Sequence, residues 1–164
     1  MSGKTPSSSE VIMTELVLPN DTNQLGNLLG GRLMHWIDIA AALATQKHSG
    51  RVCVTASVDE ISFHEPIQLG HMVHIRAIVT RAFRSSMEVE VQVEREDPLI
   101  GIRARTSVAY LTFVGIDKYG KPLPAPPVVP ETDEEKRRYE EAAIRREGRL
   151  SERKALKGSA QGNA

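Results

Sequence analysis

Apolar residues recur at helical spacing in one segment of the chain, from about residue 31 to residue 48. They go most of the way round the expected helix, which would be about 27 Å long at about 1.5 Å per residue. They are Leu33, Met34, Trp36, Ile37, Ile39, Ala40 and Leu43. Because a surface helix carries only one apolar stripe, this pattern predicts a helix that other elements surround.

After residue 51 the pattern changes to a period of two, which is typical of β-strands. In residues 85–96 a methionine and three valines alternate with glutamates and a glutamine, and we expect this polar face to meet water. Further strands are predicted at residues 11–19, 52–62, 71–82 and 102–116. Long strands with short connections favour an antiparallel sheet.

One apolar helix and these strands predict an α+β fold in which an antiparallel sheet wraps a long central helix. We place this domain at residues 11–130, with a proline-rich extended segment at its end. Such a sheet leaves its edges and one helix face poorly covered. We therefore expect the chain to pair with a second copy of itself.

Both ends of the chain differ from this domain in composition. Residues 1–10 are rich in serine and are expected to form a disordered tail. Thr132 and Glu135 have the spacing of a capping box, which predicts a charged C-terminal helix within residues 131–150. A second disordered tail is expected at residues 151–164.

Composition argues against several classes of function. The chain has 21 basic and 21 acidic residues, so its net charge is zero and nucleic acid is not an expected partner. No segment approaches the ~20 apolar residues of a membrane span, and no secretion signal is recognisable, so we expect no membrane partner and a cytoplasmic location. Cys53 is the single cysteine and is expected in the core. The usual zinc, nucleotide and serine-hydrolase motifs are absent, so no metal is expected.

The candidate chemistry lies at the apolar helix. Asp38 places a carboxylate among apolar residues, which is costly without a partner and therefore points to a function. The alternative is a structural role, with a hydrogen bond to His35 or to a neighbouring strand. Gly30 and Gly31 at the helix start would leave backbone N–H groups open to a bound oxyanion, although they could instead serve only the turn. Asn27, just before the helix, is either a substrate donor or a loop residue.

Four motifs in order, over about residues 12–130, support a family assignment. They are N-x-x-G-N-x-x-G-G-x-L-M-x-W-I-D, V-T-A-S-V-D-x-I-S-F-x-x-P-I-x-x-G, R-S-S-M-E-V and F-V-G-I-D. Together they resemble the hotdog-fold acyl-CoA thioesterases of the YciA and brain acyl-CoA hydrolase type. The resemblance implies a hotdog fold, with a long central helix, a five- or six-stranded antiparallel sheet and here a C-terminal helix. It also implies pairs of chains that assemble as a trimer of dimers.

The resemblance further implies hydrolysis of fatty acyl-CoA to free acid and coenzyme A, with no cofactor beyond the coenzyme A of the substrate. It assigns Asp38 as the residue that activates water and Asn27 as a residue supplied across the pair interface. Direct attack by the carboxylate is the competing mechanism. Thr55 would face the same groove. Arg84, Ser85 and Ser86 match the segment that contacts coenzyme A. In this reaction the helix start at Gly30 and Gly31 would polarise the thioester carbonyl.

The chain departs from the family pattern at two positions. Phe83 stands where a small residue usually precedes the arginine, and Gly115 stands where alanine is common. Further cations for the coenzyme A phosphates could come from Arg51, Arg81 or the C-terminal helix. The rival functions are a non-catalytic acyl-CoA sensor and a hotdog dehydratase, whose catalytic histidine has no counterpart that stands out here.

Overall fold

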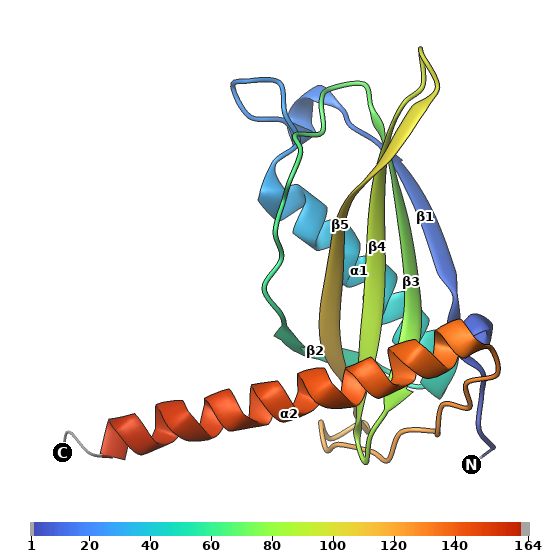
Figure 1. Cartoon of the computed structure of the whole chain (residues 1–164), viewed down its shortest axis with the longest axis vertical. Helices are drawn as coiled ribbons and strands as arrows, with labels where there is room; N and C mark the ends of the chain where they lie inside the picture. Colours follow the sequence, from blue (N-terminus) through green and yellow to red (C-terminus); the bar gives the residue numbers. More distant parts are fainter. Residues whose placement is uncertain (1, 162–164) are drawn as a thin grey trace.

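The computed structural model describes residues 2–161, with side chains to residue 157, and contains five strands, two α-helices and two short 3-10 helices (Figure 1). In chain order these elements are η1 (Pro6–Ser9), β1 (Val11–Leu16), η2 (Pro19–Asp21), α1 (Gly30–Ser49), β2 (Cys53–Val58), β3 (Met72–Ala82), β4 (Ser86–Asp97), β5 (Ile102–Gly115) and α2 (Asp133–Gln161). The strands form one antiparallel sheet in the order β1-β3-β4-β5-β2. The predicted α+β fold with a five-stranded sheet is therefore confirmed.

The sheet curls around α1, so that one face of the helix lies in the core (Figure 1). Ala40, Ala41 and Ala44 of α1 are completely buried, and their small side chains allow the helix to lie close to the strands. The inward-facing residues of β3 and β4 are mostly β-branched, as expected for a pleated, buried surface. The helix ends at Gly50, whose φ of 66° gives a left-handed C-cap.

The other face of α1 is exposed in the single chain. Met34 and Leu43, which flank the buried stripe on its two sides, are 42% and 44% exposed, as expected for a helix that a single sheet covers only in part. Strand β2 lies at one edge of the sheet, and its Val54 and Val58 are also exposed. An open sheet edge next to apolar side chains is the feature for which pairing with a second copy was predicted.

Helix α2 crosses the outer face of the sheet and covers part of it (Figure 1). The prediction that the polar face of residues 85–96 meets water is wrong at two positions, because Glu88 and Glu90 are buried. Glu88 pairs with Arg145 and Arg149 of α2, with N–O distances of 2.8 Å and 3.0 Å. The arginines on α2 convert a water-facing pattern into a buried ion-pair network.

Both ends of the described chain carry more structure than the sequence predicted. Residues 6–9 form η1, and the buried Ser9 accepts a hydrogen bond from the N–H of Val79 at 2.9 Å. The predicted capping box is confirmed, because the N–H of Glu135 donates to the hydroxyl of Thr132. Helix α2 then continues to Gln161 rather than ending near residue 150. The disordered tail was predicted at residues 151–164; residues 151–161 belong to α2 instead, and residues 162–164 lie outside the described residues. None of the described helices is long and apolar enough to cross a membrane.

Candidate active site

The first turn of α1 presents two backbone N–H groups to its surroundings. The helix begins at Gly30, and the preceding Leu29 provides no side-chain cap. The N–H groups of Arg32 and Leu33 donate to the carbonyl of Leu29, whereas those of Gly30 and Gly31 have no acceptor among the described residues. Open N–H groups at the positive end of a helix dipole are suited to stabilise a negatively charged oxygen.

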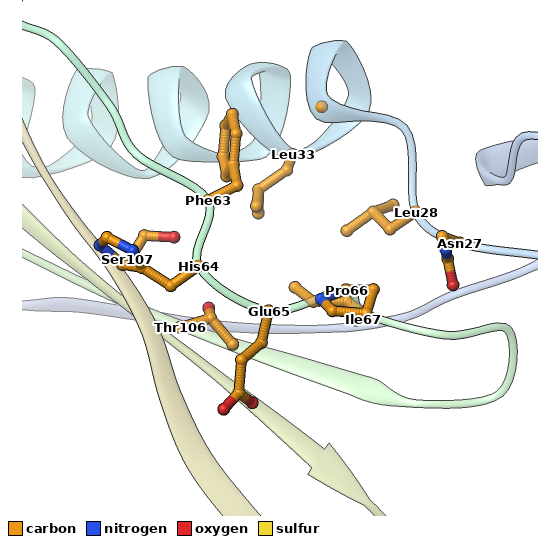
Figure 2. Close-up of a pocket in the computed structure, with 11 residues that line it drawn as sticks. Asn27, Leu28, Leu33, Phe63, His64, Glu65, Pro66, Ile67, Thr106 and Ser107 are labelled. Atoms are coloured by element: carbon orange, nitrogen blue, oxygen red, sulfur yellow. The ribbon is translucent and has the colours of Figure 1, made fainter.

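A cavity of about 300 Å³ opens beside this turn (Figure 2). It is lined by Asn27, Leu28, Gly30, Leu33, Phe63, His64, Glu65, Pro66, Ile67, Thr106 and Ser107. The start of α1 forms one side, and the segment before β3 and the strand β5 form the other. A volume of this size lies at the lower end of the range for small-molecule sites.

Asp38 lies two turns further along α1 and is half-buried. Its Oδ1 accepts a hydrogen bond from the Thr55 hydroxyl of β2 at 2.7 Å. This distance is that of a charge-assisted O–H···O⁻ bond, which holds the carboxylate in one orientation. The partner of Asp38 is thus a strand residue and not His35. Among the described residues no partner occupies Oδ2, so this oxygen is open to water.

A single chain does not bring Asp38 to the open N–H groups of α1. Asp38 follows Gly31 by seven residues, which is about 10 Å along a helix axis. A general base acts over a hydrogen-bond distance of about 3 Å, or through one water molecule. The two parts of the predicted site can therefore work together only if a second copy supplies one of them.

Arg84 lies in the turn between the end of β3 at Ala82 and the start of β4 at Ser86, at the opposite end of the sheet from the start of α1 (Figure 1). Arg84 is exposed there, and the Ser86 hydroxyl accepts a hydrogen bond from Arg146 of α2 at 3.0 Å. The guanidinium of Arg146 lies over the ring of Phe83, 4.2 Å from its centroid. The unusual aromatic residue before Arg84 is therefore a packing surface for the C-terminal helix.

Other candidate residues have structural partners. Arg51 donates to the carbonyl of Pro124, and Arg81 stacks on Tyr139 with 3.9 Å between its guanidinium carbon and the ring centroid. Cys53 is buried in the core, as predicted. Within residues 2–161 no three histidine, cysteine, aspartate or glutamate side chains are grouped as metal ligands.

Asn23, which the sequence analysis did not single out, lies in the same loop as Asn27. Its side-chain oxygen accepts hydrogen bonds from the N–H groups of Leu25 and Asn27 at 3.0 Å and 3.1 Å. These bonds fix the side chain and leave its NH₂ group without a partner among the described residues. Asn27 itself lies at one end of the cavity, away from Phe63 (Figure 2).

Comparison with known proteins identifies the family. Residues 25–102 match the model described as "Thioesterase superfamily". An uncharacterized acyl-CoA thioester hydrolase of Bacillus subtilis is 44% identical over 127 residues, which are 77% of this chain and 74% of that protein. The chain belongs to the thioesterase superfamily. Membership of the thioesterase superfamily confirms the family and hotdog fold that the four motifs predicted.

Solved structures of other thioesterases support this assignment. A hexameric acyl-CoA thioesterase in its apo form is 41% identical, with a TM-score of 0.89 over 93% of this chain and 97% of that chain. An acyl-CoA hydrolase of Staphylococcus aureus, solved as an asparagine-to-alanine variant in complex with coenzyme A, is 38% identical with a TM-score of 0.91 over 98% of this chain and 96% of that chain. The rat acetyl-coenzyme A thioesterase is 40% identical over 89% of this chain, but the chain spans only 26% of that relative.

The S. aureus hydrolase has also been solved with an aspartate and with a threonine replaced by alanine. The asparagine, aspartate and threonine replaced there are at positions 28, 43 and 60 of that protein, so they are 15 and 17 positions apart. In this chain Asn23, Asp38 and Thr55 are separated by the same 15 and 17 positions. Asn27 has no such match.

Proposed function

We propose that this chain is an acyl-CoA thioesterase, which hydrolyses acyl-CoA to a free acid and coenzyme A. The observation that carries the proposal is the hydrogen-bonded pair of Asp38 and Thr55, placed with Asn23 at the spacing of the three residues replaced in the S. aureus hydrolase. A sensor needs to bind acyl-CoA, but it has no use for a carboxylate held in one orientation with an oxygen open to water.

In the proposed reaction the thioester oxygen accepts hydrogen bonds from the N–H groups of Gly30 and Gly31. Asp38 takes a proton from a water molecule, and the resulting hydroxide adds to the thioester carbon. The carbon–sulfur bond then breaks, and the leaving thiolate takes the proton held by Asp38, which gives free coenzyme A and restores the carboxylate. This reaction needs only water and the residues of the protein, so we propose no cofactor besides the coenzyme A of the substrate.

We further propose that each site is shared between two copies of the chain. The carboxylate of Asp38 and the helix start of its own chain are about 10 Å apart, which is too far for one substrate carbon to meet both. Pairing at the open edge of β2 would place the exposed faces of two α1 helices together. In a two-fold symmetric pair, Asp38 of one chain can then meet Gly31 of the partner subunit.

The amide of Asn23 is better supported than that of Asn27 as the second polar group of the site. Its oxygen is held by two backbone N–H groups, which leaves its NH₂ group pointing away from them as a rigid donor. Asn27 remains the residue predicted from the motif resemblance, and it lines the cavity. The two asparagines make different predictions, which variants can separate.

Arg84, Ser85 and Ser86 remain the proposed contacts of the coenzyme A portion. Arg84 is exposed, so its guanidinium can reach a phosphate group. One similar structure is a hexameric acyl-CoA thioesterase, and on that basis we propose a trimer of dimers. The human, mouse and rat relatives are named cytosolic acyl coenzyme A thioester hydrolases, which supports a cytoplasmic location.

The test is thiol release from acetyl-, octanoyl- and palmitoyl-CoA by the wild type and by Asp38→Asn. Loss of a general base reduces kcat by about 10²- to 10⁴-fold, while circular dichroism and the melting temperature stay close to those of the wild type. Asp133→Asn is the matched control, because Asp133 is exposed at the start of α2. Binding of acyl-CoA by the wild type without thiol release would favour the sensor function instead.

Two further variants test the shared site. Asn23→Asp keeps the oxygen that caps the loop and removes the NH₂ donor, so it should lower kcat/KM more than Asn27→Asp does. When Asp38→Asn and Asn23→Asp chains are mixed, a shared site restores about a quarter of wild-type activity, because half of the pairs are mixed and one of their two sites is intact. A site built within one chain would regain nothing.

A further inference from the structure

The hydroxyl of Ser107 on β5 is buried and has no hydrogen-bond partner within the described part of the chain. Ser107 is only 5% exposed, and its Oγ is one of three buried side-chain atoms without a partner among the described residues. A buried hydroxyl without a partner is costly, so such groups usually have a ligand, a water molecule or a protein group beside them. The position of Ser107 therefore decides what this hydroxyl could bind.

Ser107 lines the cavity beside the first turn of α1. Figure 2 shows its side chain projecting from β5 toward the segment that carries Phe63 and His64. His64 lines the same cavity and also has no hydrogen-bond partner among the described residues. The middle of the cavity is apolar and is formed by Leu28, Leu33, Phe63, Pro66 and Ile67. The cavity thus has an apolar middle, with the Ser107 hydroxyl toward one end and the Asn27 amide at the other.

The geometry also connects this cavity to the thioester. Gly30, whose N–H is proposed to hold the thioester oxygen, lines the same cavity as Ser107. Phe63 lies close to Gly30, because a methyl group added there would be 3.6 Å from its ring. An acyl chain that starts at the helix N-terminus can therefore run between Leu33 and Phe63 toward Ser107.

We propose that Ser107 determines acyl specificity by binding an oxygen atom on the acyl chain, so that hydroxyacyl-CoA is preferred over the plain acyl-CoA of equal length. This inference rests on the proposed function, because it assumes that the thioester binds at Gly30 and Gly31. A plain chain would leave the Ser107 hydroxyl buried without a partner after water has been displaced. The expected preference is about 5- to 100-fold in kcat/KM.

The test compares hexanoyl-CoA with 3-hydroxyhexanoyl-CoA and 6-hydroxyhexanoyl-CoA, which place the oxygen at two distances from the thioester. We expect the wild type to prefer at least one hydroxyacyl-CoA, and we expect the ratio of kcat/KM for that substrate to kcat/KM for hexanoyl-CoA to fall to about one in Ser107→Ala. The wild-type measurement alone can contradict the proposal, so it does not depend on the folding of the variant.

Thr112→Val is the matched control. Thr112 also has a buried hydroxyl that lacks a partner among the residues the structure describes, but it lies five residues after Ser107 on the same strand and so faces the other side of the sheet. Its removal should leave the ratio of the two substrates unchanged. The proposal is overturned if the wild type shows no preference or if Ser107→Ala retains it. If the wild type hydrolyses none of the three substrates, the proposed function itself is wrong.

Discussion

Replacement of Thr55 by valine measures how much the orientation of Asp38 contributes to catalysis. The Thr55 hydroxyl donates to Asp38 Oδ1 at 2.7 Å, and valine has nearly the same shape without the donor. Thr55 is a positioning residue in this reaction, because it acts through Asp38. The variant removes one hydrogen bond and leaves the carboxylate in place.

The size of the effect follows from the bond and its exposure. A hydrogen bond to a charged group contributes about 1.5–3 kcal/mol. Thr55 is exposed and Asp38 is half-buried in the single chain, so water can replace part of the lost bond. We therefore expect a loss of about 1–2 kcal/mol, which is about 5- to 30-fold in kcat/KM.

The assay is thiol release with one acyl-CoA at several concentrations, so that kcat and KM are separated. The loss should fall mainly on kcat, since the hydrogen bond orients the base and does not contact the substrate. Thr55→Ser keeps the hydroxyl and should restore most of the activity. The reasoning is refuted if the valine variant is as active as the wild type, or if the serine variant is as slow as the valine variant.

Two stability predictions concern buried groups outside the site. Glu88→Ala leaves Arg145 and Arg149 without their shared carboxylate and should lower the free energy of unfolding by about 2–4 kcal/mol. The loss is slightly less than for a fully buried pair, because both arginines are 21% exposed. Urea unfolding at fixed protein concentration measures this loss, and a loss below about 1 kcal/mol contradicts the prediction. Burial lowers the pKa of His48, although its hydrogen bond to the Pro126 carbonyl opposes the shift. Below the ordinary pKa of 6.5 the imidazole of His48 binds a proton in the unfolded chain, whereas burial disfavours its protonated form in the folded chain. The free energy of unfolding therefore falls as the pH decreases, by up to about 1.4 kcal/mol per pH unit. His48→Gln should reduce this pH dependence between about pH 7 and pH 5. The assignment to His48 is disproved if urea unfolding gives the variant and the wild type the same change of unfolding free energy with pH.

The elements of the fold follow from local pattern, and most were predictable. The apolar run around Trp36 and Ile37 predicted α1 to within one residue at each end, because helical spacing is a property of neighbouring residues. The strict alternation after Ser86 predicted β4 for the same reason. The capping box of Thr132 marked the start of α2, but no stop signal marked its end, and the helix continues to Gln161.

The partners of the polar residues were not predictable from the pattern. Glu88 belongs to an alternating strand face that reads as water-facing, and only the position of α2 places Arg145 beside it. The aromatic ring of Phe83 likewise packs against the guanidinium of Arg146, which lies in a distant part of the chain. These contacts join segments about 60 residues apart, and neither segment contains information about the other's position.

The sequence by itself determined the elements and the α+β hotdog class, and it pointed to Asp38 as a candidate, since a carboxylate in an apolar helix is recognisable from its neighbours alone. Tertiary structure decided that Thr55 orients Asp38, that Asn23 has a fixed amide, and that Ser107 lies buried in the cavity. The physical reason is that spacing along a helix or strand fixes local geometry, whereas hydrogen bonds and cavities depend on how the sheet folds around the helix.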